Sequence, residues 1–576
     1  MPTKKTFEQS PLSTIKLSPL LLLWFVPVIF LAVFYFYPLG SIIQLSLSWE
    51  DQSAWNALWQ SLTSATTTRA LRFTIWQALI STLFTLVLGL PGAYLFGKYQ
   101  FRGKSLLRAL TGVPFVMPTL VVAAGFNALL GPNGWVNTLL MGALDLSSPP
   151  IQFLYTFPAI IVAHVFYNTT IILRLVGDFW SRLNPRLTDV ARVLGASPWN
   201  TLRHITIPLL SPAVAAAALL VFIFDFTSFG VVLLLGGPQF ATLEVEIYYQ
   251  TISLFNLPLA ATLSLVQLGC TLALTIAYTK LSNRLNRALP LAGRRQTQAR
   301  LRGRAEKIAA AAVILILLAF LTLPLLALAS RSLTSLGPAA EEAPRFTTAF
   351  YSALARQPQQ SQFFATPLKA LRTSLLYGAL TIILGVSLGL PAAWSLTRDR
   401  EAAWNQLLDP LIMLPLGTSA VTLGLGFIIS LDQPPLNLRT SPLLIPLAHT
   451  LVAFPFVVRS LTPALESIQP RLHQAAAVLG ASPWKVFRHI DLPLIGRALL
   501  VAASFAFMIS LGEFGATSLI TRPDNPTVPV VIYRYLSRPG VLNYGQAMAL
   551  STILMITTLA SMVAMERFRI GDVGEF

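Results

Sequence analysis

Two carboxylates stand inside long apolar stretches of the sequence, where ionisable side chains are rare and usually functional. Asp225 lies in the run Phe-Asp-Phe-Thr-Ser-Phe-Gly, and Glu513 lies in Ser-Leu-Gly-Glu-Phe-Gly. Because exposing a carboxylate to lipid is costly, both side chains are expected to face the protein interior. There they could line a path for a cationic solute, or accept a structural hydrogen bond from a neighbouring helix. Weaker polar candidates, more typical of contacts between helices, are Asn127, Asn168 and Gln267.

The other reactive side chains do not form a catalytic constellation. The five histidines are His164, His204, His449, His473 and His489. We interpret His204 and His489 as facing a partner or lipid headgroups rather than a metal. The single cysteine, Cys270, excludes a disulfide or a cysteine-based metal site within one chain. The sequence also lacks the G-x-x-x-x-G-K-[ST] phosphate loop. We therefore predict no catalytic residue, no metal and no cofactor bound by this chain.

Two polar segments, 189–208 and 474–493, are near-copies of each other. The run Val-Leu-Gly-Ala-Ser-Pro-Trp at 193–199 recurs unchanged at 478–484. Apolar residues at helical spacing predict a helix over 186–194. Gly195 is expected to end this helix, Ser197 to cap a second one, and Pro198 to occupy its first position. Pro208 is expected to stop the second helix before the next membrane span, and residues 471–493 are predicted to repeat every step.

A helix–glycine–helix element on the cytoplasmic face suits docking into a groove of another protein. The alternative is an amphipathic interfacial helix that only anchors the loop. Two near-copies at matching places in the chain favour docking. The candidate docking residues are Asp189, Ala191, Gly195, Ala196, Ser197, Pro198, Ile205 and Pro208, and then Gln474, Ala475, Ala476, Gly480, Ala481, Ser482, Pro483, Ile490 and Pro493.

The elements that must position these residues are membrane-spanning helices. The chain is 54% hydrophobic and only 11% charged, and crossing a bilayer takes about 20 apolar residues. We predict an all-α polytopic membrane protein with twelve spans in two groups of six, the run 19–39 being a retained first helix. The predicted spans are 19–39, 71–96, 108–130, 153–175, 211–235 and 255–279, followed by 308–330, 371–396, 407–430, 443–461, 496–520 and 545–565.

The two groups are internal repeats. Gly89-Leu-Pro matches Gly389-Leu-Pro, and Ala163-His164 matches Ala448-His449. An even number of spans in each repeat gives both the same orientation, so an axis along the membrane normal relates them and leaves a pathway at their interface. We divide the chain into a first six-helix domain at 1–280, a basic linker at 281–307 and a second six-helix domain at 308–576.

The net charge is +18, and the distribution of the basic residues along the chain indicates the membrane orientation. Most of the 41 lysines and arginines fall in one set of alternating loops, which the positive-inside rule places in the cytoplasm together with both termini. The densest cluster lies in the linker, which we read as a tether in contact with solvent and headgroups. Basic residues spread over separate short loops do not form the continuous basic surface that binds nucleic acid, so no nucleic-acid partner is predicted.

Each near-copy resembles the EAA loop of ABC importer permeases, whose pattern is Glu-Ala-Ala, three residues, Gly, nine residues, Ile, two residues, Pro. The resemblance covers nearly the whole chain and implies a type I importer permease fold. It further implies that each loop forms a coupling helix seated on an ATP-binding subunit, so that two such subunits bind ATP-Mg for the transporter. Gly195 and Gly480 match the family glycine. Asp189 and Gln474 stand where the family has Glu, and Gln474 lacks the acid, so the two docking contacts are expected to differ.

The external loops 236–254 and 521–544 resemble those of fused permeases for thiamine and for ferric iron, with Thr242-Leu-Glu-Val-Glu-Ile-Tyr closer to the thiamine branch. This resemblance implies ATP-driven alternating access in the cytoplasmic membrane, with solute delivered by an external binding protein. A proton-coupled secondary transporter is the alternative, but it predicts no repeated glycine-centred loop and more buried charges. A membrane enzyme would require a cluster of His, Cys or carboxylates at one depth, and the sequence shows none.

Overall fold

The computed structural model describes residues 19–48, 54–184, 186–287, 298–301, 303–335, 345–356, 365–398, 403–432, 434 and 436–568. The first half begins with α1 (Pro19–Leu31), a π-helical turn η1 (Ala32–Phe36) and α2 (Tyr37–Leu47). Its remaining elements are α3 (Ala54–Thr63), α4 (Ala65–Lys98), β1 (Tyr99–Gln100), α5 (Lys104–Leu110), α6 (Val113–Val116), α7 (Thr119–Leu130), α8 (Trp135–Leu144), α9 (Phe157–Arg182), α10 (Arg186–Val193), α11 (Pro198–Thr201), η2 (Leu202–Thr206), α12 (Ile207–Phe226), α13 (Gly230–Leu235), α14 (Leu243–Ile252) and α15 (Leu257–Arg287).

The second half largely repeats this order. Its elements are β2 (Ala299–Arg300), α17 (Arg304–Arg331), β3 (Thr334–Ser335), β4 (Arg345–Phe346), α18 (Ala349–Ala353), α19 (Pro367–Arg398), α20 (Ala403–Met413), a 3-10 turn η3 (Leu414–Gly417), α21 (Ala420–Ser430), α22 (Leu444–Glu466), α23 (Pro470–Val478), α24 (Pro483–Val486), a π-helical turn η4 (Phe487–Asp491), α25 (Leu492–Gly512), α26 (Gly515–Ile520), α27 (Val528–Leu536) and α28 (Val541–Phe568). The strands form two short pairs, β1 with β2 in parallel and β3 with β4 antiparallel.

Ten helices among the described residues are long and apolar enough to cross a membrane, or up to twelve if each of two bent pairs counts as one span. The expected spans 108–130 and 407–430 are these bent pairs, with bends of 105° and 97°. In the first pair Met117 is extended, as expected for a residue before proline. In the second, the Ser419 hydroxyl caps a new helix by accepting from the N–H of Val421 and Thr422. The predicted spans at these two places are thus interrupted by chain breaks, which the apolar runs alone did not indicate.

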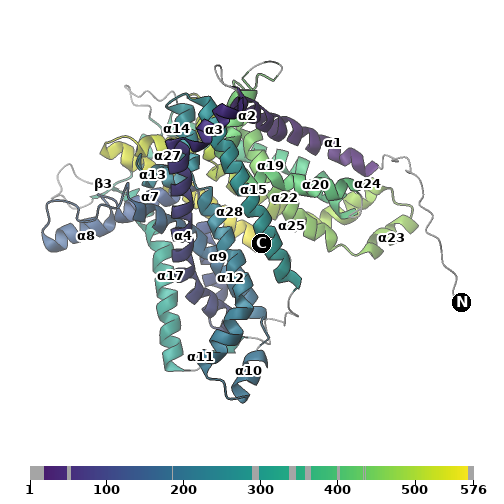
Figure 1. The fold of residues 1–576 in the computed structure, drawn as a ribbon, viewed down its shortest axis with the longest axis horizontal. Helices are drawn as coiled ribbons and strands as arrows, with labels where there is room; N and C mark the ends of the chain where they lie inside the picture. Colours follow the sequence, from purple (N-terminus) through teal and green to yellow (C-terminus); the bar gives the residue numbers. More distant parts are fainter. Residues whose placement is uncertain are drawn as a thin grey trace.

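Each half builds a bundle from long helices that approach closely. In the first half α4 packs against α9 and α12, and in the second α19 packs against α22 and α25. The close approach requires glycine: a Cβ atom on Gly89 would lie 2.7 Å from Ile172 Cβ, and one on Gly389 would lie 2.6 Å from Val457 Cγ1. Small residues at such contacts are the usual way membrane helices pack. In Figure 1, α10 and α11 end one bundle and α23 ends the other, far from each other.

The first span of each half packs against the opposite half. The α1 and α2 segments lie against α19 and α21, while α17 lies against α7. The two repeats are therefore interlocked rather than placed side by side. Such an exchange cannot be read from the order of apolar runs, because it depends on which faces meet in three dimensions.

The linker contacts the first half. Helix α15 continues to Arg287 and α17 begins at Arg304, so helix extends several residues into the linker region on both sides. Strand β2 pairs with β1 through Tyr99 and Ala299. Residues 288–297, with Arg294 and Arg295, lie outside the described residues, as do both ends of the chain. The division at 280 and 307 stays a prediction.

Candidate coupling loops and solute path

Gly195 ends the first helix of segment 189–208 as the sequence predicts. It follows α10 and adopts a φ of +87°. Its N–H donates to the Arg192 carbonyl at 3.0 Å, and the Ala196 N–H donates to the Ala191 carbonyl at 2.9 Å. This pair of bonds is the Schellman C-cap, whose left-handed residue is usually glycine. Ala191 is buried under the turn, whereas Asp189 is exposed.

The second segment has the same backbone. Gly480 follows α23 with a φ of +72°. Its N–H donates to the Ala477 carbonyl at 3.0 Å, and the Ala481 N–H donates to the Ala476 carbonyl at 3.0 Å. Ala476 is buried, while Gln474 and its neighbour Ala475 are exposed. The helix–glycine–helix prediction is confirmed in both copies.

The caps of the second short helices differ between the copies. In the first, the Ser197 hydroxyl accepts from the Asn200 N–H at 3.2 Å, with Pro198 in the first position of α11. The expectation that Ser482 does the same is wrong, because its side chain makes no cap hydrogen bond although Pro483 begins α24. The Ser482 carbonyl still accepts from the Val486 N–H at 3.0 Å, so backbone bonding alone starts this helix.

The expected stops at Pro208 and Pro493 are also wrong. Pro198–Phe226 and Pro483–Gly512 are continuous helices of 29 and 30 residues. Proline normally breaks a helix because its ring clashes with the carbonyl four residues earlier. Here the π-helical turns η2 and η4 precede each proline, and their wider i→i+5 bonding accommodates the ring. Ile205 and Ile490 lie half-buried within these turns. The second helix of each loop is thus the end of the fifth span itself.

Each loop presents large apolar side chains to its surroundings. These are Val193, Leu194 and Trp199 in the first loop and Val478, Leu479 and Trp484 in the second, between 63% and 88% exposed. Exposed apolar groups gathered at one place mark interaction surfaces. We call the two sets the loop patches. Because the sets are equivalent in the repeat, the apolar part of the two docking contacts is predicted to be alike, whereas the polar part differs between Asp189 and Gln474.

An ionic cluster distinguishes the second loop, and sequence reasoning missed it. Asp491 is buried and accepts from Arg398 at the end of α19 at 2.9 Å and from the Trp394 indole at 3.1 Å. His473 in α23 lies 2.6 Å from the other carboxylate oxygen. The equivalent position in the first loop is Thr206. The aspartate at this position, absent from the first copy, was the available sequence signal.

Asp225 is buried inside the first half, 1% exposed. The Asn168 amide donates to Asp225 Oδ1 at 2.7 Å, and His164 Nδ1 lies 3.5 Å from the same oxygen. His164 Nε2 also lies 2.7 Å from the Ser228 hydroxyl. Polar side chains of the fourth span therefore bond to residues on both sides of the start of the break at 227–229: Asn168 to Asp225, and His164 to Ser228.

Glu513 occupies the matching break in the second half. Its carboxylate accepts the backbone N–H groups of Ala516 at 2.8 Å and Thr517 at 3.0 Å, in the first turn of α26. His449 Nε2 lies 3.3 Å from the carboxylate. His449 is equivalent to His164, so a histidine of the fourth span supports each broken fifth span. The hydrogen bonds to both carboxylates come from their own half. They reach one oxygen of Asp225 and both oxygens of Glu513, while Asp225 Oδ2 is buried without a hydrogen-bond partner among the described residues.

Glu244 is a buried acid that the sequence reasoning did not single out. It lies in α14, is 1% exposed, and accepts from the Gln267 amide of α15 at 3.0 Å. It also accepts from the hydroxyl of Ser419 at the start of α21, which joins the two halves. Burial raises the pKa of the Glu244 carboxyl to about 8, and the bonds from Ser419 and Gln267 oppose this shift. The second half has Pro529 at the equivalent position.

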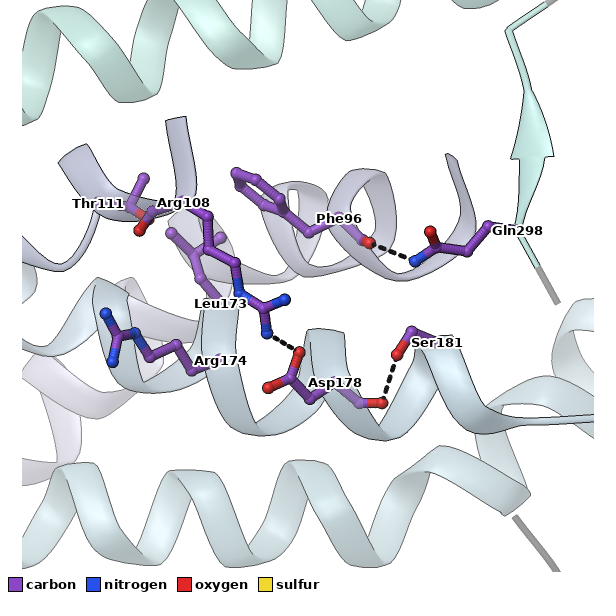
Figure 2. Close-up of a pocket in the computed structure, with 8 residues that line it drawn as sticks. All are labelled: Phe96, Arg108, Thr111, Leu173, Arg174, Asp178, Ser181 and Gln298. Atoms are coloured by element: carbon purple, nitrogen blue, oxygen red, sulfur yellow. Dashed lines mark hydrogen bonds and ion pairs between the residues drawn. The ribbon is translucent and has the colours of Figure 1, made fainter. Parts of the chain in front are cut away.

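A small polar pocket connects the linker to the fourth span. Figure 2 shows Arg108 of α5 paired with Asp178 of α9, and Gln298 of the linker donating to the Phe96 carbonyl, at 3.3 Å. Ser181, beside Asp178, donates to the Asp178 carbonyl at 2.7 Å. The linker is thus tied to the first half close to the segment that leads into the first loop. Within the described part of the chain, no three His, Cys, Asp or Glu residues gather as a metal site would require.

A family model and curated relatives agree with two repeated halves in this chain. The family model described as "Binding-protein-dependent transport system inner membrane component" matches residues 89–287 and again 385–569. The thiamine transport system permease protein ThiP of Escherichia coli K12 is 27% identical over 510 residues, covering 86% of this chain and 89% of that protein. ThiP of Brucella abortus strain 2308 is 29% identical over 508 residues, covering 87% of each. A crystallised bacterial ABC transporter of alginate has a chain that aligns with a TM-score of 0.39 at 19% identity, covering 46% of this chain and 96% of that one.

The doubled match accounts for the architecture. Each family segment contains one helix–glycine–helix loop, one broken fifth span and one fourth-span histidine. A proton-coupled secondary transporter, the alternative raised by twelve spans in two repeats, has no support among these matches. The chain belongs to the family of binding-protein-dependent transport system inner membrane components, as a fused two-half permease of an ABC importer in the inner membrane.

Proposed function

We propose that this permease imports thiamine, with ATP hydrolysed by two copies of a separate subunit docked on the two loops. The observation that carries the docking is the pair of exposed loop patches, each presented by a Schellman turn. The solute assignment is supported by similarity over most of the chain to proteins named as thiamine permeases. Ferric iron is the second solute considered, from the likeness of the external loops. The solute arrives on an external binding protein.

The loops are built to transmit movement into the membrane. Each docking segment continues through a π-helical turn into the fifth span without a break. A displacement of the loop by an ATP-binding subunit therefore moves the span directly. The far end of the same span carries the break at which Asp225 or Glu513 is held.

Asp225 and Glu513 act in this proposal as positioning residues beside the solute path. Their oxygens accept hydrogen bonds from within the same half, which keeps each broken span in a defined shape. A backbone break inside a membrane needs such partners because its N–H and C=O groups lose helical bonding. The orientation proposed from the charge distribution places the loops, the linker and both chain ends in the cytoplasm.

Uptake by reconstituted vesicles tests the function. The permease is reconstituted with its ATP-binding subunit and binding protein, and accumulation of labelled thiamine is compared with that of ferric iron, with ATP and without it. We expect ATP-dependent thiamine uptake. Uptake of iron but not thiamine would overturn the solute assignment. Co-purification of the ATP-binding subunit with the wild-type chain, but not after Trp199→Asp combined with Trp484→Asp, tests the docking separately.

A further inference from the structure

Four aromatic rings form a continuous cluster between the two halves. The rings of Phe229 and Phe514 stack with centroids 5.3 Å apart and planes 20° from parallel. Phe229 also contacts Tyr248 at 5.4 Å, and Phe514 contacts Tyr533 at 5.5 Å. The two phenylalanines are 7% and 3% exposed. We call these four residues the axial aromatic cluster.

The cluster lies on the axis that relates the two repeats. Phe229 and Phe514 are equivalent positions, 285 residues apart, and so are Tyr248 and Tyr533. A side chain that contacts its own repeat-equivalent must lie at the axis, since only there do symmetry-related atoms meet. The pathway between two parallel repeats follows that axis. The stacked rings therefore stand in the pathway.

The helix is interrupted at each phenylalanine. Phe229 and Phe514 immediately precede the short helices α13 and α26, after the breaks that end α12 and α25. A Cβ atom on Gly230 would lie 2.6 Å from Thr119 Oγ1, and one on Gly515 would lie 2.9 Å from Ala420 Cβ. The residue after each phenylalanine thus packs against the start of the second helix of the bent pair in its own half, so that a movement of either half moves its ring too.

The tyrosines close the cluster on the side of α14 and α27. Burial, and then the interaction with the Tyr533 hydroxyl, raise the pKa of Tyr248. These helices follow the external loops, whereas the loop patches lie at the other end of the fifth spans. In Figure 1 the bundle ends that carry α10 and α23 stand apart, while α13, α14 and α27 lie close together. The rings thus lie at the end of the fifth spans that is away from the docking loops.

We propose that the axial aromatic cluster is the external gate of the solute path, and that Phe229 and Phe514 take a flat aromatic cation between their ring faces as they part. The second clause rests on the proposed thiamine import. Stacked rings present electron-rich faces that attract a cation once it is desolvated, and offset stacking suits a planar heterocycle. A solute with two aromatic rings, one of them cationic, replaces the contact that the phenylalanines lose on separating.

Cross-linking tests the gate without reference to the solute. On a Cys270→Ala background, Phe229→Cys and Phe514→Cys are combined in the complex with the ATP-binding subunit. The thiols are joined directly by an added oxidant, or bridged by a short bis-methanethiosulfonate reagent that forms a disulfide with each thiol and releases sulfinate. Loss of both thiols from maleimide labelling reports the bond. We expect the bond to form and to abolish uptake, with recovery on reduction. The two single-cysteine variants, which lose one ring but cannot be bridged, are the matched controls.

Ring chemistry is tested by substitution. Phe229→Leu combined with Phe514→Leu keeps apolar bulk but removes the ring faces, so vesicles preloaded with solute should stay tight while the kcat/KM of thiamine uptake falls roughly tenfold. Phe229→Trp combined with Phe514→Trp keeps the faces and should retain a larger share of uptake than the leucine pair. Equal uptake by the leucine pair and the wild type would refute the aromatic recognition.

The outcomes separate the gate from the solute assignment. A bond that forms without changing uptake, or thiols that never join, refutes the gate even if thiamine is the solute. If wild-type vesicles transport another solute and the bond stops that transport, the gate stands and the thiamine assignment fails, together with the recognition clause that rests on it.

Discussion

The glycine of each docking loop offers a quantitative test, because its requirement is conformational rather than steric. A Cβ atom added to Gly195 or Gly480 would meet nothing within 4 Å. The φ values of +87° and +72° nevertheless lie in the left-handed region. For an L-residue other than asparagine or aspartate this conformation costs about 1–2 kcal/mol. Gly195→Val is therefore expected to shift the loop away from its docking shape.

The size of the effect follows from that cost. A penalty of about 1–2 kcal/mol is a factor of roughly 5–30 in the population of the Schellman turn. The apparent affinity for the ATP-binding subunit should fall by a similar factor, because the binding-competent shape is populated less often. Gly195→Asn should cost less, since asparagine tolerates a positive φ. Gly480→Val should behave as Gly195→Val does.

Binding of the ATP-binding subunit to the purified permease, titrated by co-purification or by ATPase coupling, measures the series. Gly142→Val is the matched control, because a Cβ atom there also meets nothing within 4 Å and the φ is not positive. If Gly195→Asn weakened binding as much as Gly195→Val, the partner would be excluding the side chain itself, and the conformational reasoning would fail. Unchanged binding of Gly195→Val would remove the docking role.

Three further predictions concern buried acids. Asp491→Thr, which copies the first loop, should lower thermal stability and uptake by leaving His473 and Arg398 without their shared carboxylate, a loss of about 3–5 kcal/mol for a broken buried pair; unchanged melting would contradict this. Glu244 keeps its proton in the folded state up to about pH 8, so stability should fall as pH rises from the ordinary carboxyl range through pH 8, and Glu244→Gln should abolish this fall. A melting series across pH 5–9 checks it, and an equal slope in the variant would count against the assignment. Glu513→Gln should impair uptake in vesicles, since an amide N–H would face the backbone donors of α26; normal rates would reduce Glu513 to a packing role.

Local pattern was enough to predict most of the long helices and the turns at Gly195 and Gly480. Apolar run length gave the spans, and the Gly-Ala-Ser-Pro order gave the turn at Gly195 because a left-handed C-cap and a proline start are local properties. The prediction that Pro208 ends the helix was wrong because of a local feature that the sequence does not reveal. A π-helical turn at residues 202–206 accommodates the ring, and sequence does not distinguish it from an α-helical turn.

Contacts between segments far apart in the chain could not be predicted from local sequence pattern. Asp225 and Glu513 were recognised as interior acids, yet their partners His164 and His449 lie on other helices. Glu244 was passed over because α14 is a short external helix, and its burial depends on Ser419 of the opposite half. The axial stack follows from how the two halves meet, although the matching Phe-Gly pairs at 229 and 514 stood in the repeat as a signal.

The exchange of first spans bears on how the halves can move. Because α2 lies against α21 and α17 against α7, separating the halves completely would expose large apolar surfaces. A rocking movement about these exchanged helices would keep that packing while parting contacts near the axis. These contacts include the stacked rings, the bond between Glu244 and Ser419, and the packing of α14 against α21. In the gate that we propose, the change between closed and open states therefore takes place near the axis.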